Sequence, residues 1–336
     1  MSEGRDLPTV LFDPEVNRSI NEALPRAVVE AFGVITTLGD GATLVAVAAL
    51  LYWFGAAEDR HDRAMVLAIA VTTLALVAGL KGILEVQRPL YAAEPPLAFA
   101  PETYPGWSTP SAHAMGAASV YGALAVVTNV GKRWQRYAVA AALIVAIPFS
   151  RVVLGVHYVG DVILGVALGL ALVAVALRIT NRSVTPMFAL SLAIAVGAFL
   201  LGSEEYTTMA IGASLGGLVT WPLLEDRNAE PLGASVLALG LFVLPLLAVV
   251  RLLDLLIAVE GGFVIAETVT VSLLAILETV GFAVAFGGAI AVPFVATRFN
   301  DSRVTRTLQT ALPFSGRTVD ADAVGEEPTP EERTDD

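Results

Sequence analysis

Long apolar runs constrain the fold of this chain more than any other feature. A helix needs about 20 apolar residues to cross the hydrocarbon core of a bilayer, and several runs with few or no charges reach that length. Of the 336 residues, 56% are hydrophobic and only 15% are charged, against roughly 25% charged in an average soluble domain. We therefore predict an all-α, polytopic helical membrane protein.

The first half of the chain predicts one interfacial helix and five membrane spans. Residues 19–39 mix apolar positions with Glu22, Arg26 and Glu30, a pattern typical of an amphipathic helix that lies at the membrane surface. The spans are expected at about residues 42–56, 64–88, 110–130, 137–153 and 159–177. Pro89 is expected to end the second span, because proline disfavours helix in the residue before it.

A polar segment, RITNRSVTP, separates this half from a second apolar half. There we expect four more spans, at about residues 187–201, 207–224, 232–256 and within 263–294. The resulting domains are a polar N-terminus (1–18), a catalytic membrane domain (19–178), a C-terminal membrane domain (185–306) and an acidic tail (307–336). The tail has too little apolar content to fold and is predicted to be disordered.

The distribution of basic residues predicts the orientation in the membrane, because cytoplasmic loops are enriched in Lys and Arg. The loops after the first, third and fifth expected spans contain such residues, as does the region before the tail. They are Arg60, Arg63, Lys132, Arg133, Arg136, Arg178, Arg182, Arg298, Arg303 and Arg306. We therefore expect a multi-pass plasma-membrane protein whose C-terminal tail is cytoplasmic. Its N-terminus and the three motif segments described below, with the candidate active site, are expected to face outside.

The charge balance argues against nucleic acid as a partner. The net charge is −12, and the segment from Ser315 to Asp336 supplies −6 of it, from eight acids and two arginines. Arginine greatly outnumbers lysine, and together with the acid excess this resembles proteins from high-salt cytoplasms. The chain has no cysteine, which excludes disulfides, thiolate metal sites and cysteine nucleophiles. The oligomeric state cannot be predicted.

Two cations lie near the end of the second expected span, in KGILEVQRP. Lys81 and Arg88 are seven residues apart, which would orient them within about 20° of each other on one helix face. Both could then contact one anion. A basic pair near a helix end also commonly extends toward the lipid headgroups, and this segment alone leaves both interpretations open.

The segment STPSAH marks the start of the third expected span. Thr109 is predicted as the N-cap and Pro110 as the first helical residue. The first turn of a helix presents unpaired amide groups and a partial positive charge, which favour anion binding. Ser111 adds a hydroxyl donor, and His113 adds a group that exchanges a proton near neutral pH. A lone histidine at such a position is more often structural than catalytic.

The third segment, SRVVLGVHYVGD, joins the fourth and fifth expected spans. Arg151 lies near the end of one span, Gly155 permits a turn, and His157 precedes the next span. Asp161 follows His157 by four residues, so the two side chains share a helix face. A carboxylate in that position would fix the tautomer of the imidazole, which makes a ring nitrogen the candidate nucleophile. A pair that only ties two helices together is the alternative.

Taken together, the three segments suit a transferring phosphoryl group, whose charge is stabilised mainly by positioned positive charge. They supply three cations, a helix N-terminus, two histidines and one carboxylate. No cluster of acids that could hold magnesium or zinc lies nearby in the sequence. We predict a metal-independent reaction with no cofactor.

The motifs Lys-x(6)-Arg-Pro, Pro-Ser-x-His and Ser-Arg-x(5)-His-x(3)-Asp resemble, in this order, the signature of the type 2 phosphatidic acid phosphatase (PAP2) family. The resemblance covers about residues 19–178. It implies that His157 attacks phosphorus to form a phosphohistidine, that Asp161 orients His157, and that His113 protonates the leaving group. It also implies a phosphate-binding set of Lys81, Arg88, Ser111, Ala112 and Arg151. Ala112 departs from the family pattern, which usually has glycine at this position.

The expected function is that of an integral-membrane hydrolase acting on a lipid phosphate monoester or an isoprenyl diphosphate. A lipid phosphotransferase with the same site is one alternative. A lipid transporter or flippase is another, suggested by the extra spans and by Glu267 and Glu278 within them. The sequence does not identify the lipid.

Overall fold

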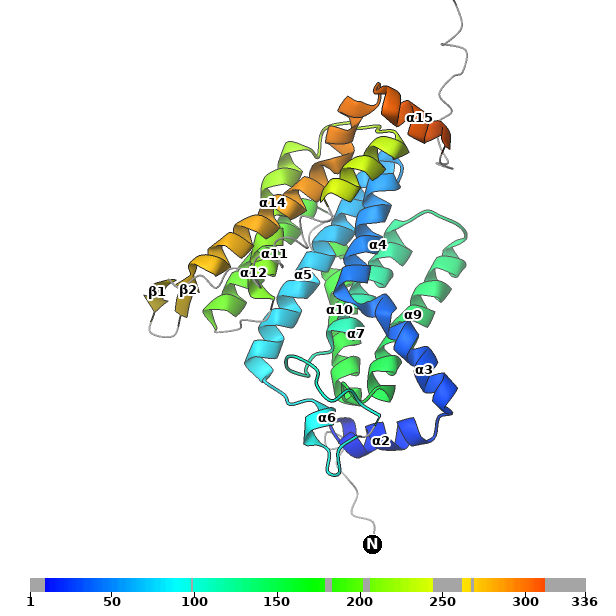
Figure 1. The fold of residues 1–336 in the computed structure, drawn as a ribbon, viewed down its shortest axis with the longest axis vertical. Helices are drawn as coiled ribbons and strands as arrows, with labels where there is room; N and C mark the ends of the chain where they lie inside the picture. The colour runs from blue at the N-terminus through cyan, green and yellow to red at the C-terminus, as the bar shows by residue number, and fades with distance from the viewer. Residues whose placement is uncertain are drawn as a thin grey trace, which may run out of the picture.

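The computed structural model describes residues 10–97, 99–178, 183–201, 206–243, 262–266 and 269–311. Long helices lie side by side in a bundle, with α2 and α6 at the lower end and α15 at the upper end in Figure 1. The all-α polytopic prediction is confirmed, and the described residues add one short β-hairpin that the sequence did not predict.

The first half forms the helices that carry the polar segments. They are α2 (Pro14–Glu22), α3 (Arg26–Ile35), η1 (Thr36–Gly39), α4 (Gly41–Phe54), η2 (Ala57–Asp59), α5 (Arg60–Leu84), α6 (Pro89–Ala92), α7 (Ala112–Gly116), the π-helical η3 (Ala117–Tyr121), α8 (Gly122–Val127), α9 (Arg133–Val153) and α10 (Val159–Arg178). Because α7, η3 and α8 follow one another without a break, they form one helix from Ala112 to Val127.

The second half is also helical wherever it is described, apart from the hairpin. It contains α11 (Val184–Leu200), α12 (Thr207–Thr220), η4 (Trp221–Leu223), a helix at Gly233–Val243, strands β1 (Gly262–Ala266) and β2 (Val269–Ser272), α14 (Leu273–Ala296), η5 (Thr297–Phe299) and α15 (Arg303–Ala311). The strands pair antiparallel, with Gly262 opposite Ser272.

A described helix lies at the position of every predicted span, but not all of these helices are long. Four helices are long and apolar enough to cross a membrane: Ala57–Ala92, Arg133–Val153, Val159–Arg178 and Ala275–Phe299. Two further segments, Arg26–Gly39 and Gly41–Phe54, pass the same test as a pair that is bent by 52°. The remaining spans were predicted from apolar content alone, which does not fix where a helix ends.

Several predicted boundaries differ from the structure. Residues 19–39 contain parts of two helices and η1, whereas one interfacial helix was expected. The run 263–294 begins with the hairpin, and the expected span within it corresponds to α14; Glu267 lies outside the described residues. α15 continues to Ala311, inside the segment predicted to be disordered. The rest of that tail, 312–336, lies outside the described residues.

The two halves share one hydrophobic core. Leu44, Met65 and Val120 of the first half belong to the same buried cluster as Phe188 and Ile290 of the second half. Two hydrogen bonds reinforce this packing, because α4 donates from Tyr52 Oη to Ile290 O (2.9 Å) and from Trp53 Nε1 to Ala289 O (2.7 Å). The second half therefore packs directly against the helices that carry the polar segments.

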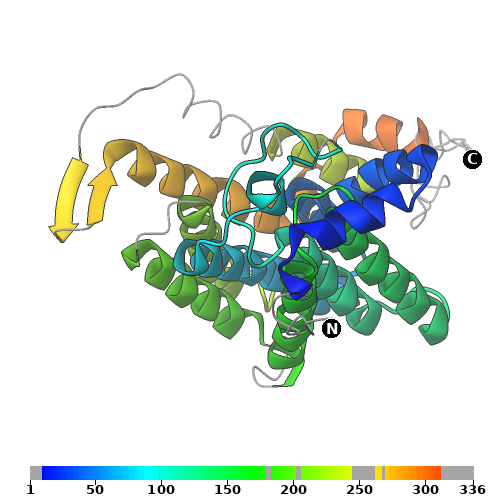
Figure 2. The ribbon, with the colours of Figure 1, turned by 90° about the horizontal axis from the view of Figure 1, so that it is seen from below.

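Close helix packing brings α7 against α10 at the lower end of the bundle. A Cβ atom on Gly165 would lie 2.8 Å from Ser111 O, so only glycine allows this approach. Seen from below, α2 and α6 lie in front of the ends of the longer helices (Figure 2). The start of α7, the connection from α9 to α10 and the loop after α6 consequently meet in one place.

Candidate active site

His157 and Asp161 form a buried pair at this meeting point. Gly155 adopts a positive φ of 68°, which turns the chain after α9 and directs it into α10. His157 Nδ1 lies 3.2 Å from Asp161 Oδ2, and the side chains are 2% and 0% exposed. The structure therefore brings together the two residues that the sequence paired at i and i+4.

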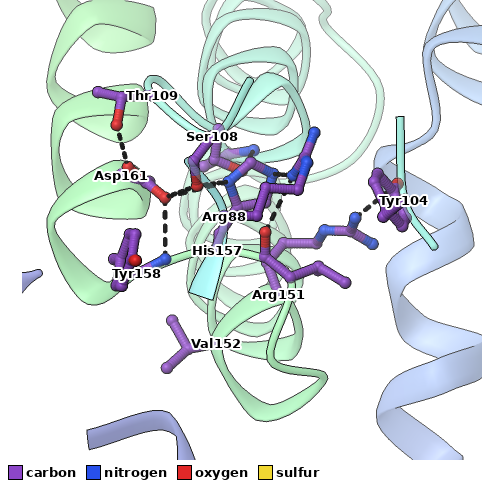
Figure 3. A network of polar contacts seen from close by, with 12 residues as sticks. Arg88, Tyr104, Ser108, Thr109, Arg151, Val152, His157, Tyr158 and Asp161 are labelled. Carbon is purple, nitrogen blue, oxygen red and sulfur yellow. Dashed lines mark hydrogen bonds and ion pairs between the residues drawn. The ribbon is translucent and has the colours of Figure 1, made fainter. Parts of the chain in front are cut away.

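Other donors surround the Asp161 carboxylate. It accepts hydrogen bonds from Ser108 Oγ, from Thr109 Oγ1 and from the amide of Tyr158, the last at 2.8 Å (Figure 3). A carboxylate that accepts several hydrogen bonds is stabilised in its ionised form. Asp161 is thus held as an anion directly behind the imidazole of His157.

The other ring nitrogen of His157 faces Arg88. The distance from Arg88 Nη1 to His157 Nε2 is 3.1 Å. Because a guanidinium group can only donate, this contact makes Nε2 the acceptor, and the proton of the neutral ring then lies on Nδ1, toward Asp161. Nε2 is the nitrogen with a lone pair that could attack an electrophile.

Burial lowers the pKa of His157 well below its ordinary value, and the charges of Arg88 and Arg151 act in the same direction. The hydrogen bond to Asp161 and its negative charge oppose this shift without cancelling it. An unperturbed histidine titrates near about 6.5. The neutral ring, which is the nucleophilic form, therefore persists below that pH.

We expect His157 to remain neutral at pH 6.5 in the folded protein and to gain its proton only at more acidic pH. In the unfolded chain the ring binds its proton near about 6.5. Between the two pKa values the unfolded state binds more protons, so this group makes stability fall as the pH drops through that window. Histidine-selective ¹⁵N NMR in detergent, with His157→Ala to assign the signal, measures the titration. A half-protonated ring at or above pH 6.5 would contradict the expectation.

Arg88 is held by the loop that follows α6. Its Nε donates to Gly106 O (2.9 Å) and its Nη2 to Pro105 O (2.9 Å). Its Cζ lies 4.5 Å from the centre of the Tyr104 ring. A cavity of about 380 Å³ opens beside Arg88, and its other lining residues are Gln87, Tyr91, Tyr104, Pro105, Gly106 and Trp107. Arg88 thus lies between this cavity and His157.

Arg151 also contacts Tyr104 (Figure 3). It donates from Nη2 to Tyr104 Oη (2.7 Å) and from Nη1 to Thr36 Oγ1 (2.7 Å), and its Cζ is 5.2 Å from the ring centre. Its Nε is buried and has no hydrogen-bond partner. An unpaired buried donor is costly, which suits a position where an anion binds.

Lys81 and Arg88 do not share a helix face, contrary to the prediction. α5 ends at Leu84, and Glu85 adopts a left-handed conformation with φ of 45°. The helix therefore ends before Pro89 can act on it, and Arg88 lies in extended chain. Both cations still reach the site, since Lys81 is buried and its charge acts on His113, while Arg88 contacts His157.

The N-cap of α7 is Ser111, not Thr109 as predicted. α7 begins at Ala112, and Ser111 Oγ accepts from the amide of Ala114 at 3.4 Å. The hydroxyl of Thr109 donates to Asp161, so it is not available to cap a helix. Ala112 is helical and is not one of the positive-φ residues, so alanine is accommodated where the family usually has glycine.

His113 faces a carboxylate that the sequence did not suggest. Its Nε2 lies 2.7 Å from Oδ1 of Asp40, between η1 and α4. The predicted site residues are thus located at one end of the bundle: Arg88 contacts His157, Lys81 lies near His113, and the charge of Arg151 acts on both histidines. Their roles in catalysis remain predictions.

Besides Asp40, three further contributions to the site were missed by sequence reasoning. Ser108 donates to Asp161, and Tyr104 joins the two arginines. Asn17 of α2 is fully buried and donates to Val152 O (2.8 Å) and His157 O (2.9 Å), which holds the turn that carries His157. Residues 1–18 were predicted to be only a polar N-terminus. An asparagine in a polar segment carries no local signal for such a contact.

In the residues that the structure describes, no group of three or more His, Cys, Asp or Glu side chains could hold a metal ion. The donor set at the site consists of two imidazoles, each with its own carboxylate, and of cations. Such a set is directed at an anion, because cations placed around a site stabilise negative charge there.

Fold and site together define an all-α polytopic membrane protein with two histidines, each beside a carboxylate, among buried cations. The model of the PAP2 superfamily matches residues 63–185, a segment that includes every predicted site residue. This match is consistent with a member of the PAP2 superfamily, and a PAP2 segment implies phosphatase-type activity on phosphate esters. No curated protein and no solved structure matches the chain.

Proposed function

We propose that this protein is an integral-membrane phosphatase that hydrolyses a lipid phosphate monoester or an isoprenyl diphosphate through a phosphohistidine on His157. One observation carries the proposal: His157 Nε2 lies 3.1 Å from Arg88 Nη1, while Nδ1 faces Asp161. A lone pair is thereby directed toward a cation that can bind phosphate, and a carboxylate stabilises the positive charge that forms on the ring during attack.

In the first step, Nε2 of His157 forms a bond to phosphorus while the bond from phosphorus to the leaving oxygen breaks. His113 donates a proton to that oxygen. In the second step, water attacks phosphorus, the bond from phosphorus to Nε2 breaks, and His113 takes up a proton from the water. The products are the free alcohol, or a phosphorylated alcohol from a diphosphate, and inorganic phosphate.

Substrate binding requires an exchange of partners at Arg88, because its Nη1 occupies the space in front of Nε2 and His157 is only 2% exposed. The phosphate oxygens would replace His157 as acceptors for Arg88. Arg151 offers its unpaired Nε, and the start of α7 offers Ser111 and the amide of Ala112. The cations are thus neutralised by the substrate itself.

Two features favour a lipid over a soluble ester. Helices long and apolar enough to cross a membrane carry or adjoin the site. The cavity beside Arg88 is lined by Tyr91 and Trp107, both of which are also exposed. Aromatic side chains of this kind favour the interface between headgroups and acyl chains. A phosphate could therefore reach Arg88 while its apolar chain stays in the bilayer.

We further propose that the site faces the outside of the plasma membrane and that the C-terminal tail is cytoplasmic. Basic residues cluster at the end of the bundle opposite to the site, where α5 begins with Arg60 and Arg63 and where α15 lies (Figure 1). Lys and Arg in short loops are typical of the cytoplasmic side.

The function is tested by phosphate release in detergent from a panel of phosphatidic acid, a phosphatidylglycerol phosphate analogue and a polyprenyl diphosphate. At least one substrate is expected to release free phosphate with turnover. A phosphorylated lipid in place of free phosphate would instead indicate a phosphotransferase. No turnover across the panel would contradict the proposal and favour a transport role for the second half.

Chelation is expected to leave the rate unchanged. Positive charge at the site comes from Lys81, Arg88 and Arg151, whose binding of phosphate does not depend on a metal ion. The test measures turnover of the best panel substrate with and without EDTA, at an EDTA concentration on the order of a thousandfold above that of trace metal ions. The two rates should be equal. A loss that added Mg²⁺ or Zn²⁺ restores would refute the metal-independent mechanism.

A further inference from the structure

The break between α3 and α4 lies against the active site. η1 and the residue after it, Asp40, connect two helices that meet at a bend of 52°. A Cβ atom on Gly39 would clash with Ile147 Cγ2 and would lie 3.1 Å from His113 Cδ2. The absence of a side chain at Gly39 is therefore what allows this segment to approach the imidazole of His113.

The segment contributes two polar contacts to the site. Thr36 Oγ1 accepts from Arg151 at 2.7 Å, and Asp40 Oδ1 lies 2.7 Å from His113 Nε2. The His113 side chain is 12% exposed, whereas that of Asp40 is 49% exposed. A nearly buried imidazole is thus in contact with a carboxylate that is accessible to solvent. The segment precedes residues 63–185, so the family match does not include it.

Asp40 supplies negative charge beside His113, which is otherwise surrounded by positive charge. Arg151 of α9 and Lys81 of α5 both act on the ring with positive charge and oppose its protonation. Asp40 acts in the opposite direction, through its charge and its hydrogen bond. An acid that must carry a proton among cations needs such a partner, because like charges destabilise an imidazolium.

We propose that Asp40 is a positioning residue that fixes the tautomer of His113 and stabilises its imidazolium form during proton transfer. This inference rests on the proposed phosphatase function. Asp40 holds the proton on Nε2, so Nδ1 is the nitrogen that exchanges a proton with substrate. Nδ1–H protonates the leaving oxygen as the bond from phosphorus to that oxygen breaks. The Nδ1 lone pair then accepts a proton from the attacking water as the phosphohistidine breaks down.

The leaving group separates this role from a structural one. A departing alkoxide is strongly basic and needs a proton, whereas a nitrophenolate leaves without one. General acid catalysis contributes about 10²–10⁴-fold where the proton is needed. Asp40→Asn should therefore lower kcat/KM about 10²-fold for dodecyl phosphate, and by less than about threefold for p-nitrophenyl phosphate, which makes no demand on the acid. kcat/KM is the right quantity because it reports only the steps through formation of the phosphohistidine.

The comparison is made on one preparation of each variant, so a partly folded sample lowers both rates alike and leaves their ratio intact. Asp40→Ala, measured in the same way, should give the same selective loss. Glu30→Gln is the matched control, because Glu30 lies on α3, pairs with Arg26 at 2.9 Å and has a 64% exposed side chain. Both rates should be unchanged in that variant.

Equal losses on the two esters in Asp40→Asn would mean a structural role and would overturn the inference, as would no loss on either. The outcome is distinct from failure of the proposed function. If the wild-type protein hydrolyses neither these esters nor any panel lipid, the phosphatase proposal itself fails. If it hydrolyses them and the ratio does not change, only the role of Asp40 is wrong.

Discussion

His157→Ala is expected to lower phosphate release by at least about 10⁴-fold, the largest effect of any single substitution in the chain. Without Nε2 no phosphohistidine can form, and the carboxylate of Asp161 has no imidazolium to stabilise. The fold should survive, since the substitution removes a buried ring but leaves the backbone contacts from Asn17 in place. Phosphate release from the best panel substrate measures the loss.

His61→Ala is the matched control for this experiment. His61 is exposed, and its ring makes an edge contact with Trp221 at 5.7 Å, at the start of α5 and away from the site. Its replacement should leave the rate unchanged. A substrate labelled with ³²P should give an acid-labile phosphoenzyme in the wild-type protein and in His61→Ala but not in His157→Ala. Retention of more than about a tenth of the wild-type rate by a folded His157→Ala would refute the nucleophile.

Asp161→Asn is expected to lower kcat about 10³-fold with a much smaller change in KM, as in triads where the carboxylate orients the histidine. The shape of the side chain is kept, but its charge is lost. An amide also presents two donors to a position where Ser108, Thr109 and the amide of Tyr158 already donate. The imidazole can then adopt the other tautomer, in which Nε2 carries the proton and cannot attack phosphorus.

Ser108→Ala tests whether the charge or the hydrogen-bond network carries this effect. It removes one donor to Asp161 but keeps the carboxylate and its contact with His157. The loss should be clearly smaller than that of Asp161→Asn. The proposed role of Asp161 would be contradicted if Asp161→Asn changed only KM, or if Ser108→Ala lowered kcat as much as Asp161→Asn does. Thermal unfolding in detergent shows whether each variant keeps its fold.

The residues of the candidate site could be named from the sequence because they lie in three short segments. The i, i+4 relation of His157 and Asp161 follows from helix geometry, and their contact agrees with it. The helix positions followed from apolar runs, since burial in a bilayer acts on local composition. The helix ends did not. α5 stops at Leu84, where Glu85 adopts a left-handed conformation, and α7 starts at Ala112, since the hydroxyl of Thr109 donates to Asp161 across 52 residues of sequence and does not cap the helix.

The contacts that Asn17 and Asp40 make with the site could not be predicted, because these residues come from distant parts of the chain. Asn17 holds the turn of His157 across 140 residues of sequence, and Asp40 reaches His113 across 73. Neither has a pattern that distinguishes it from a solvated polar residue. Close packing selects such contacts, and it depends on the whole bundle.

By itself, the sequence determined that the chain is helical and apolar and that it carries the three motifs on which the phosphatase proposal rests, because hydrophobic length and short motifs are local properties. Only the tertiary structure decided which nitrogen of His157 faces Arg88, which carboxylate contacts His113, and how the second half packs against the first. These depend on distances of about 3 Å between buried polar groups. In a medium of low polarity such distances decide whether a buried charge is stabilised or costly.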